Sequence, residues 1–400
     1  MSTPTQTAEP DASEERVLTG YEGHFTLVLA FSWLALLLGR SAVSPLLPNV
    51  VDSFGITAAR AGVALTVMMG AHSVMQYPAG RISDGLTRST LVVAGLATGV
   101  VGLATLTQAT SYPLFVVGTA LLGCGTGVFF SPARALLSDL YETRLTEALG
   151  VQTTAGLSGS ALAGVLATAT VAVAAWRYTF LVPLVAVLVA LVAVHRLTRE
   201  PYRVGRVPLE TVSTARRLAA RADVRRLLAV TSARSFVNQA IIGFLPLFLI
   251  EAKGFAGPTA NAAYALVFVV GAVVGPLVGR FADRSRPKVV ITGLLTVAAA
   301  GVVVLVLAGS FAVAIAGVLL VAVGMWGFPP VIQSLLLSLF DDAQLGGDFG
   351  ALKMVYTGVG SAGPAAFGLA VSAVGYTRGL ALLVGVLVFG VGVMFTVPEQ

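Results

Sequence analysis

The sequence is divided into apolar blocks of about twenty residues, and this spacing limits the chain to very few kinds of structure. At 1.5 Å per residue, a helix of that length crosses the ~30 Å hydrocarbon core of a bilayer. Barrel strands would be about ten residues long and alternate in polarity, which these blocks do not. A water-soluble fold is excluded because 56% of the 400 residues are hydrophobic and only 11% are charged. We therefore predict an all-α membrane protein with twelve transmembrane helices.

The predicted spans form two groups of six. The first group covers residues 25–48, 60–79, 90–108, 112–131, 149–171 and 176–195. The second covers residues 227–250, 259–278, 289–308, 312–335, 350–373 and 378–397. The only long polar interruption, with nine arginines between Arg196 and Arg226, separates the groups. The predicted domains are a disordered cytoplasmic tail (1–23), a six-helix bundle (24–195), a basic cytoplasmic linker (196–226) and a second six-helix bundle (227–400).

Positive charge is distributed unequally between the two sides of the predicted bundle. Of 25 Lys and Arg, eighteen lie in the N-terminal tail and the loops on its side, four in the opposite loops and three within spans. Cytoplasmic loops of membrane proteins carry such an excess. We expect a multi-pass protein of the cell membrane with both termini in the cytoplasm. We therefore attribute the net charge of +6 to the membrane topology and not to a nucleic-acid-binding surface.

The two halves of the chain resemble each other at a separation of 199 residues. This separation also relates the run LLSDLY, ending at Tyr141, to LLLSLF, ending at Phe340. Chance similarity among apolar helices would not keep polar loop residues in register, so we infer a duplication. A repeat of six helices preserves orientation, which predicts pseudo-two-fold symmetry about the membrane normal and a functional site between the halves. The loop residues in register are Gly80, Arg81 and Asp84 with Gly279, Arg280 and Asp283.

Two loop motifs resemble the signature of the major facilitator superfamily of transporters. GRISDGLTR begins at Gly80 and GRFADRSRPK at Gly279; each has a glycine, a small residue followed by Asp, and basic residues. The resemblance implies a carrier whose two bundles alternate around a central site. The loops would latch one state through helix ends or arginines of the opposite half. The expected latch residues are Gly80, Arg81, Asp84, Arg88, Gly279, Arg280, Asp283 and Arg284.

The first span ends LGRSAVSPLLP, which is similar to a pattern of twelve-span drug and solute exporters. Two departures disfavour drug/proton antiport. The Gly-Pro element GVGSAGPAAFG lies in the eleventh span, whereas that family carries it in the fifth, and the fourth span has no arginine before its glycines. Efflux of drugs or hydrophobic compounds is the alternative function. A non-transporting membrane sensor or scaffold is a third, which an appended signalling domain would favour.

Two arginines, Arg40 and Arg234, lie inside symmetry-related spans. A cation at such depth costs several kcal/mol unless it faces water or a partner. All 19 Asp and Glu lie in tails, loops or helix ends, so no carboxylate is placed to neutralise either arginine. Guanidinium groups bind carboxylate and phosphate oxygens in a bidentate manner, so we predict a secondary transporter of a small organic anion. The alternative is that Arg40 is a structural hub satisfied by carbonyls, water and hydroxyl groups.

Other polar residues of the spans are candidates for the same site. His72 is a candidate proton carrier, although a lone histidine on a helix more often serves packing. Lys353, one turn inside the eleventh span, is expected to extend toward the cytoplasm. The predicted substrate-binding residues are Arg40, Arg234, Asn238, Trp326, Gln333, Gln152 and Tyr356.

The chain carries no motif on which an enzymatic function could be argued. It lacks HExxH, GxxxxGK[ST] and GxSxG, and its three dispersed histidines and single cysteine, Cys124, indicate no metal site. We therefore predict no enzyme, cofactor or metal, and transport driven by gradients or exchange. The expected partners are a small-molecule solute and the lipid bilayer, not nucleic acid, and the protein is expected to be a monomer.

Overall fold

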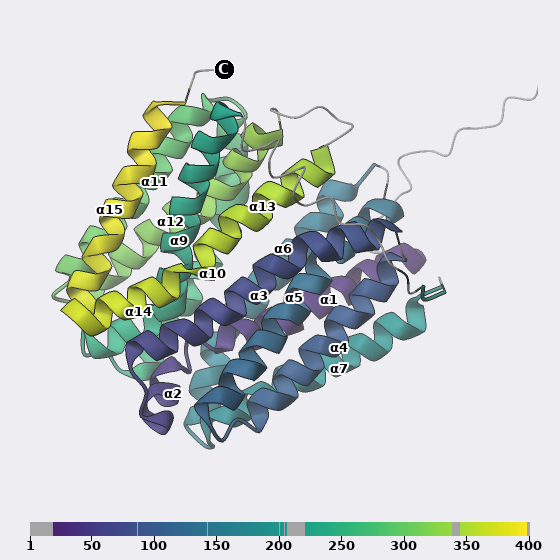
Figure 1. Ribbon diagram of the computed structural model, residues 1–400, viewed down its shortest axis with the longest axis horizontal. Helices are drawn as coiled ribbons and strands as arrows, with labels where there is room; N and C mark the ends of the chain where they lie inside the picture. The colour runs from purple at the N-terminus through teal and green to yellow at the C-terminus, as the bar shows by residue number, and fades with distance from the viewer. Residues whose placement is uncertain are drawn as a thin grey trace, which may run out of the picture.

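The computed structural model of the chain is a bundle in which every regular element of the described residues is helical (Figure 1). The described residues are 19–85, 87–141, 143–199, 201–203, 205, 221–337 and 345–397. The first half contains α1 (Gly20–Ala42), α2 (Leu47–Phe54), α3 (Ala58–Gly85), α4 (Arg88–Thr107), α5 (Tyr112–Leu140), α6 (Leu145–Val171), η1 (Trp176–Phe180) and α7 (Leu181–Leu197). The second half contains α9 (Ala222–Glu251), α10 (Gly257–Ala282), α11 (Pro287–Leu307), α12 (Phe311–Leu337), α13 (Leu345–Ser361), α14 (Gly363–Val374) and α15 (Tyr376–Phe395).

Eleven helical segments of the described chain are long and apolar enough to cross a membrane. The remaining predicted span, the second, corresponds to the 28-residue helix α3. α3 carries polar side chains such as His72, Gln76 and Arg81 along its length. It packs against α5 in its own half and against α13 and α14 of the other half, so its polar groups face protein. The predicted class of fold, two six-helix bundles, is confirmed.

Three of the predicted spans are interrupted where the sequence places proline near the break. α1 ends at Ala42 and the chain resumes as α2, with Pro48 in its first turn. The eleventh span divides into α13 and α14 at Ala362, with Pro364 in the first turn of α14. The sixth begins as the 3₁₀ segment η1 before α7. Proline is tolerated at such positions because the first N–H groups of a helix have no intrahelical acceptor.

Some helix boundaries differ from the prediction. The fourth span was expected to end at residue 131, but Pro132 lies inside α5, which continues to Leu140. Proline inside a membrane helix is tolerated where neighbouring groups satisfy the freed carbonyl. α1 begins at Gly20, so the last residues of the predicted tail are helical. Residues 1–18 of that tail and residues 206–220 of the predicted linker lie outside the described part of the chain.

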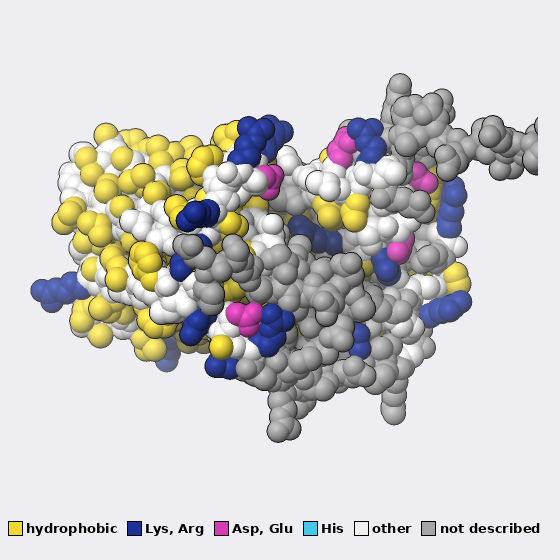
Figure 2. Space-filling model, turned by 90° about the horizontal axis from the view of Figure 1, so that it is seen from above, with side chains coloured by type: hydrophobic (Ala, Val, Ile, Leu, Met, Phe, Trp, Pro, Cys, Tyr) yellow, Lys and Arg dark blue, Asp and Glu magenta, His cyan; other side chains and the backbone are white. Residues whose placement is uncertain are grey.

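The bundle has two ends that differ in charge. We call the end that carries Gly20 and Val397 the termini side, and the end that carries the loops after α2, α4, α9 and α11 the far side. Figure 2 shows the molecule from the termini side, where Lys and Arg side chains gather over the face. The far side carries few basic residues, among them Arg60, Arg177 and Lys253. Lys253 donates to the carbonyl oxygens of Val306 (2.9 Å) and Ala308 (2.8 Å) at the end of α11, and desolvation lowers the pKa of its ammonium group.

The two halves meet most closely toward the far side. α3 lies beside α14 along this boundary (Figure 1), and a Cβ added at Gly62 would overlap the carbonyl oxygen of Pro364. Glycine at this position therefore lets the two backbones touch. Three hydrogen bonds between described residues cross the boundary at this level. They are the amide of Asn261 to the Thr168 hydroxyl, the Tyr264 hydroxyl to the Ser41 carbonyl, and the Ala365 N–H to the Thr66 hydroxyl, each 3.0 Å long.

Candidate functional site

Four basic side chains lie in the middle of the bundle, two from each half. Arg40 of α1 and Arg134 of α5 come from the first half, and Arg234 of α9 and Lys353 of α13 from the second. We call these four residues the central basic cluster. Each is half-buried, although its helix is packed against other helices. Side chains of this kind are expensive to place in a membrane protein interior unless they face water or a partner.

Arg40 has no hydrogen-bond or ion-pair partner for its guanidinium group among the described residues. It lies within electrostatic range of the phenol of Tyr264 and of the imidazole of His72. The Tyr264 hydroxyl donates to the carbonyl of Ser41, the next residue of α1, and this bond links the two halves beside Arg40. The five donors of the guanidinium are therefore available for a group that the described residues do not supply.

Arg234, in contrast, has a protein partner. Its Nη2 donates to the carbonyl oxygen of Met325 on α12, and its Cζ lies 5.4 Å from the centre of the Phe328 ring. In a helix this carbonyl would accept from the N–H four residues later, but that residue is Pro329, which has none. The proline thus frees the acceptor that Arg234 uses. The Nε of Arg234 remains buried without a partner.

Arg134 and Lys353 approach one aromatic ring from opposite halves. The Arg134 Cζ lies 4.6 Å from the centre of the Phe130 ring, and the Lys353 Nζ lies 4.0 Å from it. The two like charges are within electrostatic range of each other. Cation–π attraction contributes about 0.5 to 2 kcal/mol to holding each cation there. Tyr356, one turn beyond Lys353, lies within range of both Arg134 and Arg234 and so connects the two parts of the cluster.

No carboxylate of the described residues pairs with the cluster. Ion pairs between described residues lie on the surface of the molecule. They join Arg88 to Asp139, Arg144 to Glu147, and Arg221 to Asp223. Arg134 has one side-chain hydrogen bond, from Nη2 to the Thr153 hydroxyl at 3.2 Å, and Lys353 has none among the residues described. The centre of the bundle therefore carries an excess of positive charge.

Several of the predicted substrate-binding residues offer further unpartnered polar atoms. Both amide atoms of Gln152, which is 1% exposed, are buried without a hydrogen bond. The same holds for the Oδ1 of Asn238 and the indole Nε1 of Trp326. Buried polar groups are normally satisfied, so these atoms indicate places for water or a ligand. Gln333 is half-buried on α12.

His72 is held by one hydrogen bond. Its Nδ1 lies 3.0 Å from the Thr126 hydroxyl, which itself donates to the carbonyl of Gly123 at 2.9 Å. Because the hydroxyl proton is used on that carbonyl, Nδ1 must be the donor, and the lone pair of the neutral ring lies on Nε2. The charges of Arg40 and Lys353 both act on this imidazole. His72 is therefore within electrostatic range of both cations that have no acceptor among the described residues.

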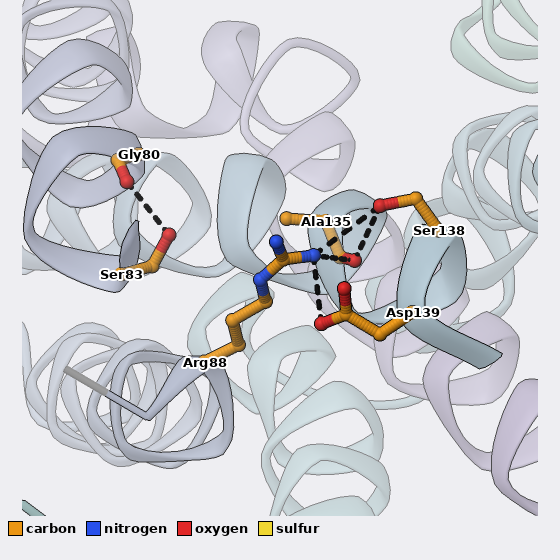
Figure 3. Close-up of polar contacts among 6 residues, drawn as sticks. All are labelled: Gly80, Ser83, Arg88, Ala135, Ser138 and Asp139. Atoms are coloured by element: carbon orange, nitrogen blue, oxygen red, sulfur yellow. Dashed lines mark hydrogen bonds and ion pairs between the residues drawn. The ribbon is translucent and has the colours of Figure 1, made fainter. Parts of the chain in front are cut away.

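The predicted latch residues lie at the termini side. Arg88, at the start of α4, contacts the end of α5 in its own half: its Nη1 lies 2.8 Å from Asp139 and 3.2 Å from the Ser138 hydroxyl, and it donates to the Ala135 carbonyl (Figure 3). The glycines pack alike in both halves. A Cβ at Gly80 would lie 3.6 Å from Ser131, and one at Gly279 would lie 3.6 Å from Pro330. The Ser83 hydroxyl donates to the Gly80 carbonyl at 2.7 Å (Figure 3).

For the remaining latch residues, the contacts between described residues do not test the predicted role. Arg280 and Asp283 end α10, and both are exposed, as is Arg284. Arg81 is half-buried near the end of α3, and the side chain of Asp84 lies outside the described part of the chain. The latch therefore stays a prediction.

The sequence reasoning missed two members of the central basic cluster. Arg134 was assigned to a cytoplasmic loop because the fourth span was ended at residue 131; α5 in fact carries it two turns from its end. Lys353 was expected to extend toward the cytoplasm, but its ammonium group lies over Phe130 of the opposite half. Helical spacing from Phe130 would have placed Arg134 on the same face of α5, four residues on.

A bundle of two repeated six-helix halves, with polar groups meeting from both, has the architecture of a membrane carrier. The chain belongs to the Major Facilitator Superfamily, whose sequence profile matches residues 29–364. The profile match confirms the family that the resemblance of its loop motifs implied.

Two uncharacterised MFS-type transporters from strains of Mycobacterium tuberculosis are 28% identical to this chain over 186 residues. The match covers 43% of this chain and about a quarter (26%) of the length of those relatives. A crystal structure of a bacterial homologue of the human lysosomal transporter Spinster, in an inward-facing and occupied conformation, is similar with a TM-score of 0.82. The two are 15% identical over 95% of this chain and 97% of the other. The human organic anion transporter MFSD10 (TETRAN) is similar with a TM-score of 0.70, at 16% identity over 94% of this chain and all of the other.

Proposed function

We propose that this protein is a secondary transporter that carries a small organic anion through the centre of the bundle by alternating access. One observation carries the proposal: Arg40 and Lys353 lie in the middle of the bundle with no carboxylate or hydrogen-bond acceptor among the described residues. An anion is the ligand that these donors lack. The similarity in fold to an organic anion transporter is compatible with the proposal.

The cluster offers an anion contacts from both halves of the molecule. Arg40 supplies a planar fork that matches two oxygens of a carboxylate or phosphate, and Lys353 supplies a compact charge. Such charge-assisted hydrogen bonds are worth about 1.5 to 3 kcal/mol each. Arg134, Arg234 and the Tyr356 hydroxyl would complete the site. Because the ligand would bind to both halves at once, its binding energy could favour their movement against each other.

The two ends of the bundle suggest which state the structure represents. The halves touch backbone to backbone at the far side, where Gly62 meets Pro364. By the distribution of basic residues, the termini side would face the cytoplasm of the cell membrane. The structure would then be closed to the outside, as in the inward-facing conformation of the bacterial Spinster homologue. In the opposite state, the latch loops around Asp84 and Asp283 would hold the termini side closed.

Proton coupling, if the carrier uses it, would depend on His72. The buried cluster has no carboxylate among the described residues, so the usual acidic proton carrier is missing there. The Nε2 of His72, beside the cluster, is a basic nitrogen that can take up a proton without losing a hydrogen bond. We therefore assign His72 as the candidate proton carrier.

The test is ligand-induced thermal stabilisation of the purified protein. Dicarboxylates, monocarboxylates and organophosphates are screened beside tetraphenylphosphonium, a lipophilic cation that represents the drug-efflux alternative. An anion that raises the melting temperature is then measured on Arg40→Gln, Lys353→Gln and Arg40→Lys. The matched control is Arg60→Gln, which removes an exposed arginine at the far end of α3.

We expect the two glutamine variants to fold and to bind the anion about 10- to 150-fold more weakly, as the loss of one charge-assisted contact requires. Arg40→Lys should retain part of the affinity, because it keeps the charge but not the fork. Arg60→Gln should bind as the wild type does. Stabilisation by the cation alone would favour drug efflux. An Arg40→Gln protein that melts lower without ligand, and is still stabilised normally by the anion, would identify Arg40 as a structural hub.

A further inference from the structure

A groove of about 680 Å³ lies at the termini-side end of α10 and α11, away from the central basic cluster. Its walls are largely apolar, and its rim carries the arginines Arg284 and Arg286 with Ser285 between them. The other lining residues are Val278, Phe281, Val289, Val290, Gly293 and Leu294. An apolar groove with a basic rim suits a ligand that is itself anionic at one end and apolar along the rest.

The groove opens toward the surrounding lipid rather than toward the other half. Phe281 is 64% exposed, and Leu277 and Val273 on the same face of α10 are each 57% exposed. These three residues follow each other at four-residue spacing, so they form one stripe along the helix. Val289, at the start of α11, is 63% exposed on the other wall. The groove thus continues the lipid-facing surface of the second half up to the level of the loop.

The charge at this loop differs between the two halves. In the first half, Arg88 is neutralised by Asp139 at the end of α5. At the separation of 199 residues Arg284 corresponds to Gly85, so the second half carries a cation at this position of the loop and the first half does not. Arg284 has no side-chain partner among the described residues, and neither has its neighbour Asp283. A group from outside the chain can therefore bind at Arg284.

We propose that this groove binds one anionic phospholipid from the membrane leaflet on the termini side. Its phosphate would lie at Arg284 and Arg286, since guanidinium groups bind phosphate oxygens in a bidentate manner. Its acyl chain lies along Phe281, Leu277 and Val273. Basic residues at the ends of membrane helices attract anionic headgroups, and the apolar walls exclude an ion without a chain from most of the groove. The site is independent of the function proposed for the central basic cluster.

The test is native mass spectrometry of the full-length protein in detergent, titrated with phosphatidylglycerol and, separately, with phosphatidylcholine. We expect the wild type to bind the first phosphatidylglycerol more tightly than phosphatidylcholine. Arg284→Gln should weaken phosphatidylglycerol binding about 5-fold and the double variant Arg284→Gln/Arg286→Gln about 30-fold, from a contribution of roughly 1 kcal/mol for each basic residue near the headgroup. Phosphatidylcholine binding should change little in either variant.

Two controls separate this site from general attraction of lipid to a basic face. Arg196→Gln/Arg203→Gln removes two exposed arginines from the first half on the same side and should leave phosphatidylglycerol binding unchanged. Phe281→Ala should weaken both lipids, because it removes part of the apolar wall. Equal binding of the two lipids by the wild type, or an equal loss in the control variant, would overturn the proposal. So would displacement of phosphatidylglycerol by inorganic phosphate at the same concentration, which would indicate a site for a free anion.

Discussion

The hydrogen bond between Arg234 and the Met325 carbonyl depends on Pro329, and this dependence can be measured. Pro329→Ala restores an N–H four residues after Met325, so the carbonyl regains its ordinary helical donor. The hydrogen bond from Arg234 then adds less stability, because the Met325 carbonyl is already satisfied by the helix. The neighbouring Pro330 frees the carbonyl of Trp326 instead, and no hydrogen bond from Arg234 is found there among the described contacts. Pro330→Ala is therefore a matched control.

The expected magnitude follows from the contacts of Arg234. A hydrogen bond from a charged donor is worth about 1.5 to 3 kcal/mol, and a buried carbonyl left without a donor costs a similar amount. Arg234→Gln alone also removes the unfavourable burial of a cation. The sign of its effect on the free energy of unfolding therefore does not test the hydrogen bond. The double-mutant cycle with Pro329→Ala cancels this term, because the same buried cation is removed in both backgrounds. We expect Arg234→Gln to be less destabilising by about 1.5 to 3 kcal/mol when Pro329 is replaced.

The assay is reversible unfolding of the four proteins in mixed micelles, in which the fraction of denaturing detergent is varied and helix content is followed by circular dichroism. The coupling free energy is the difference between the effects of Arg234→Gln in the two backgrounds. For Pro330→Ala the same cycle should give a coupling within about 0.5 kcal/mol of zero, as for independent sites. A coupling near zero for Pro329, or an equally large one for Pro330, would refute the argument that proline provides the acceptor.

Three further predictions concern the movement and orientation of the halves. Gly62→Ala should separate α3 from α14 and shift the carrier toward the state open at the far side, detected as faster labelling of a cysteine introduced nearby in a Cys124→Ala background. Gly385→Ala, whose Cβ would meet no atom within 4 Å, should not have this effect. A cysteine in place of Ser285 should react with an impermeant reagent only from the cytoplasm, and labelling of intact cells would contradict the topology. Asp84→Asn should slow transport without weakening substrate binding, whereas an unchanged rate would limit Asp84 to a role in topology.

The fold could be predicted because its main signal, the length of the apolar blocks, depends on the bilayer and not on tertiary contacts. The errors arose where a helix is longer than its apolar block. The fourth span was ended at residue 131, whereas α5 continues through Pro132 to Leu140. Proline inside a membrane helix is tolerated when a neighbouring group satisfies the freed carbonyl. That error moved Arg134 into a loop and removed it from the candidate site. Gly20 likewise starts α1 before the apolar residues begin.

The site could be predicted only in part, because sequence gives depth in the membrane but not the partner across the bundle. Arg40 and Arg234 were recognised from their depth alone. The structure does not join them directly: Arg40 lies near His72 and Tyr264, whereas Arg234 donates to the Met325 carbonyl on α12. Lys353 was expected to extend along its own helix, whereas its position is decided by Phe130 of the other half. The spacing of residues along one helix does not predict a contact with the other half.

The buried cations of the cluster differ in whether the described residues supply them with an acceptor. We expect this difference to determine their roles. Arg234 has a carbonyl that a proline has freed, and Arg134 has the Thr153 hydroxyl and the Phe130 ring. These two cations could remain in place through the transport cycle without a ligand. Among the described residues, Arg40 has no acceptor and Lys353 has only an aromatic face. A cation without an acceptor gains most from an anion, because the ligand then replaces water and not an existing bond. Arg40 and Lys353 should therefore dominate affinity, and Arg234 should contribute more to the stability of the second half.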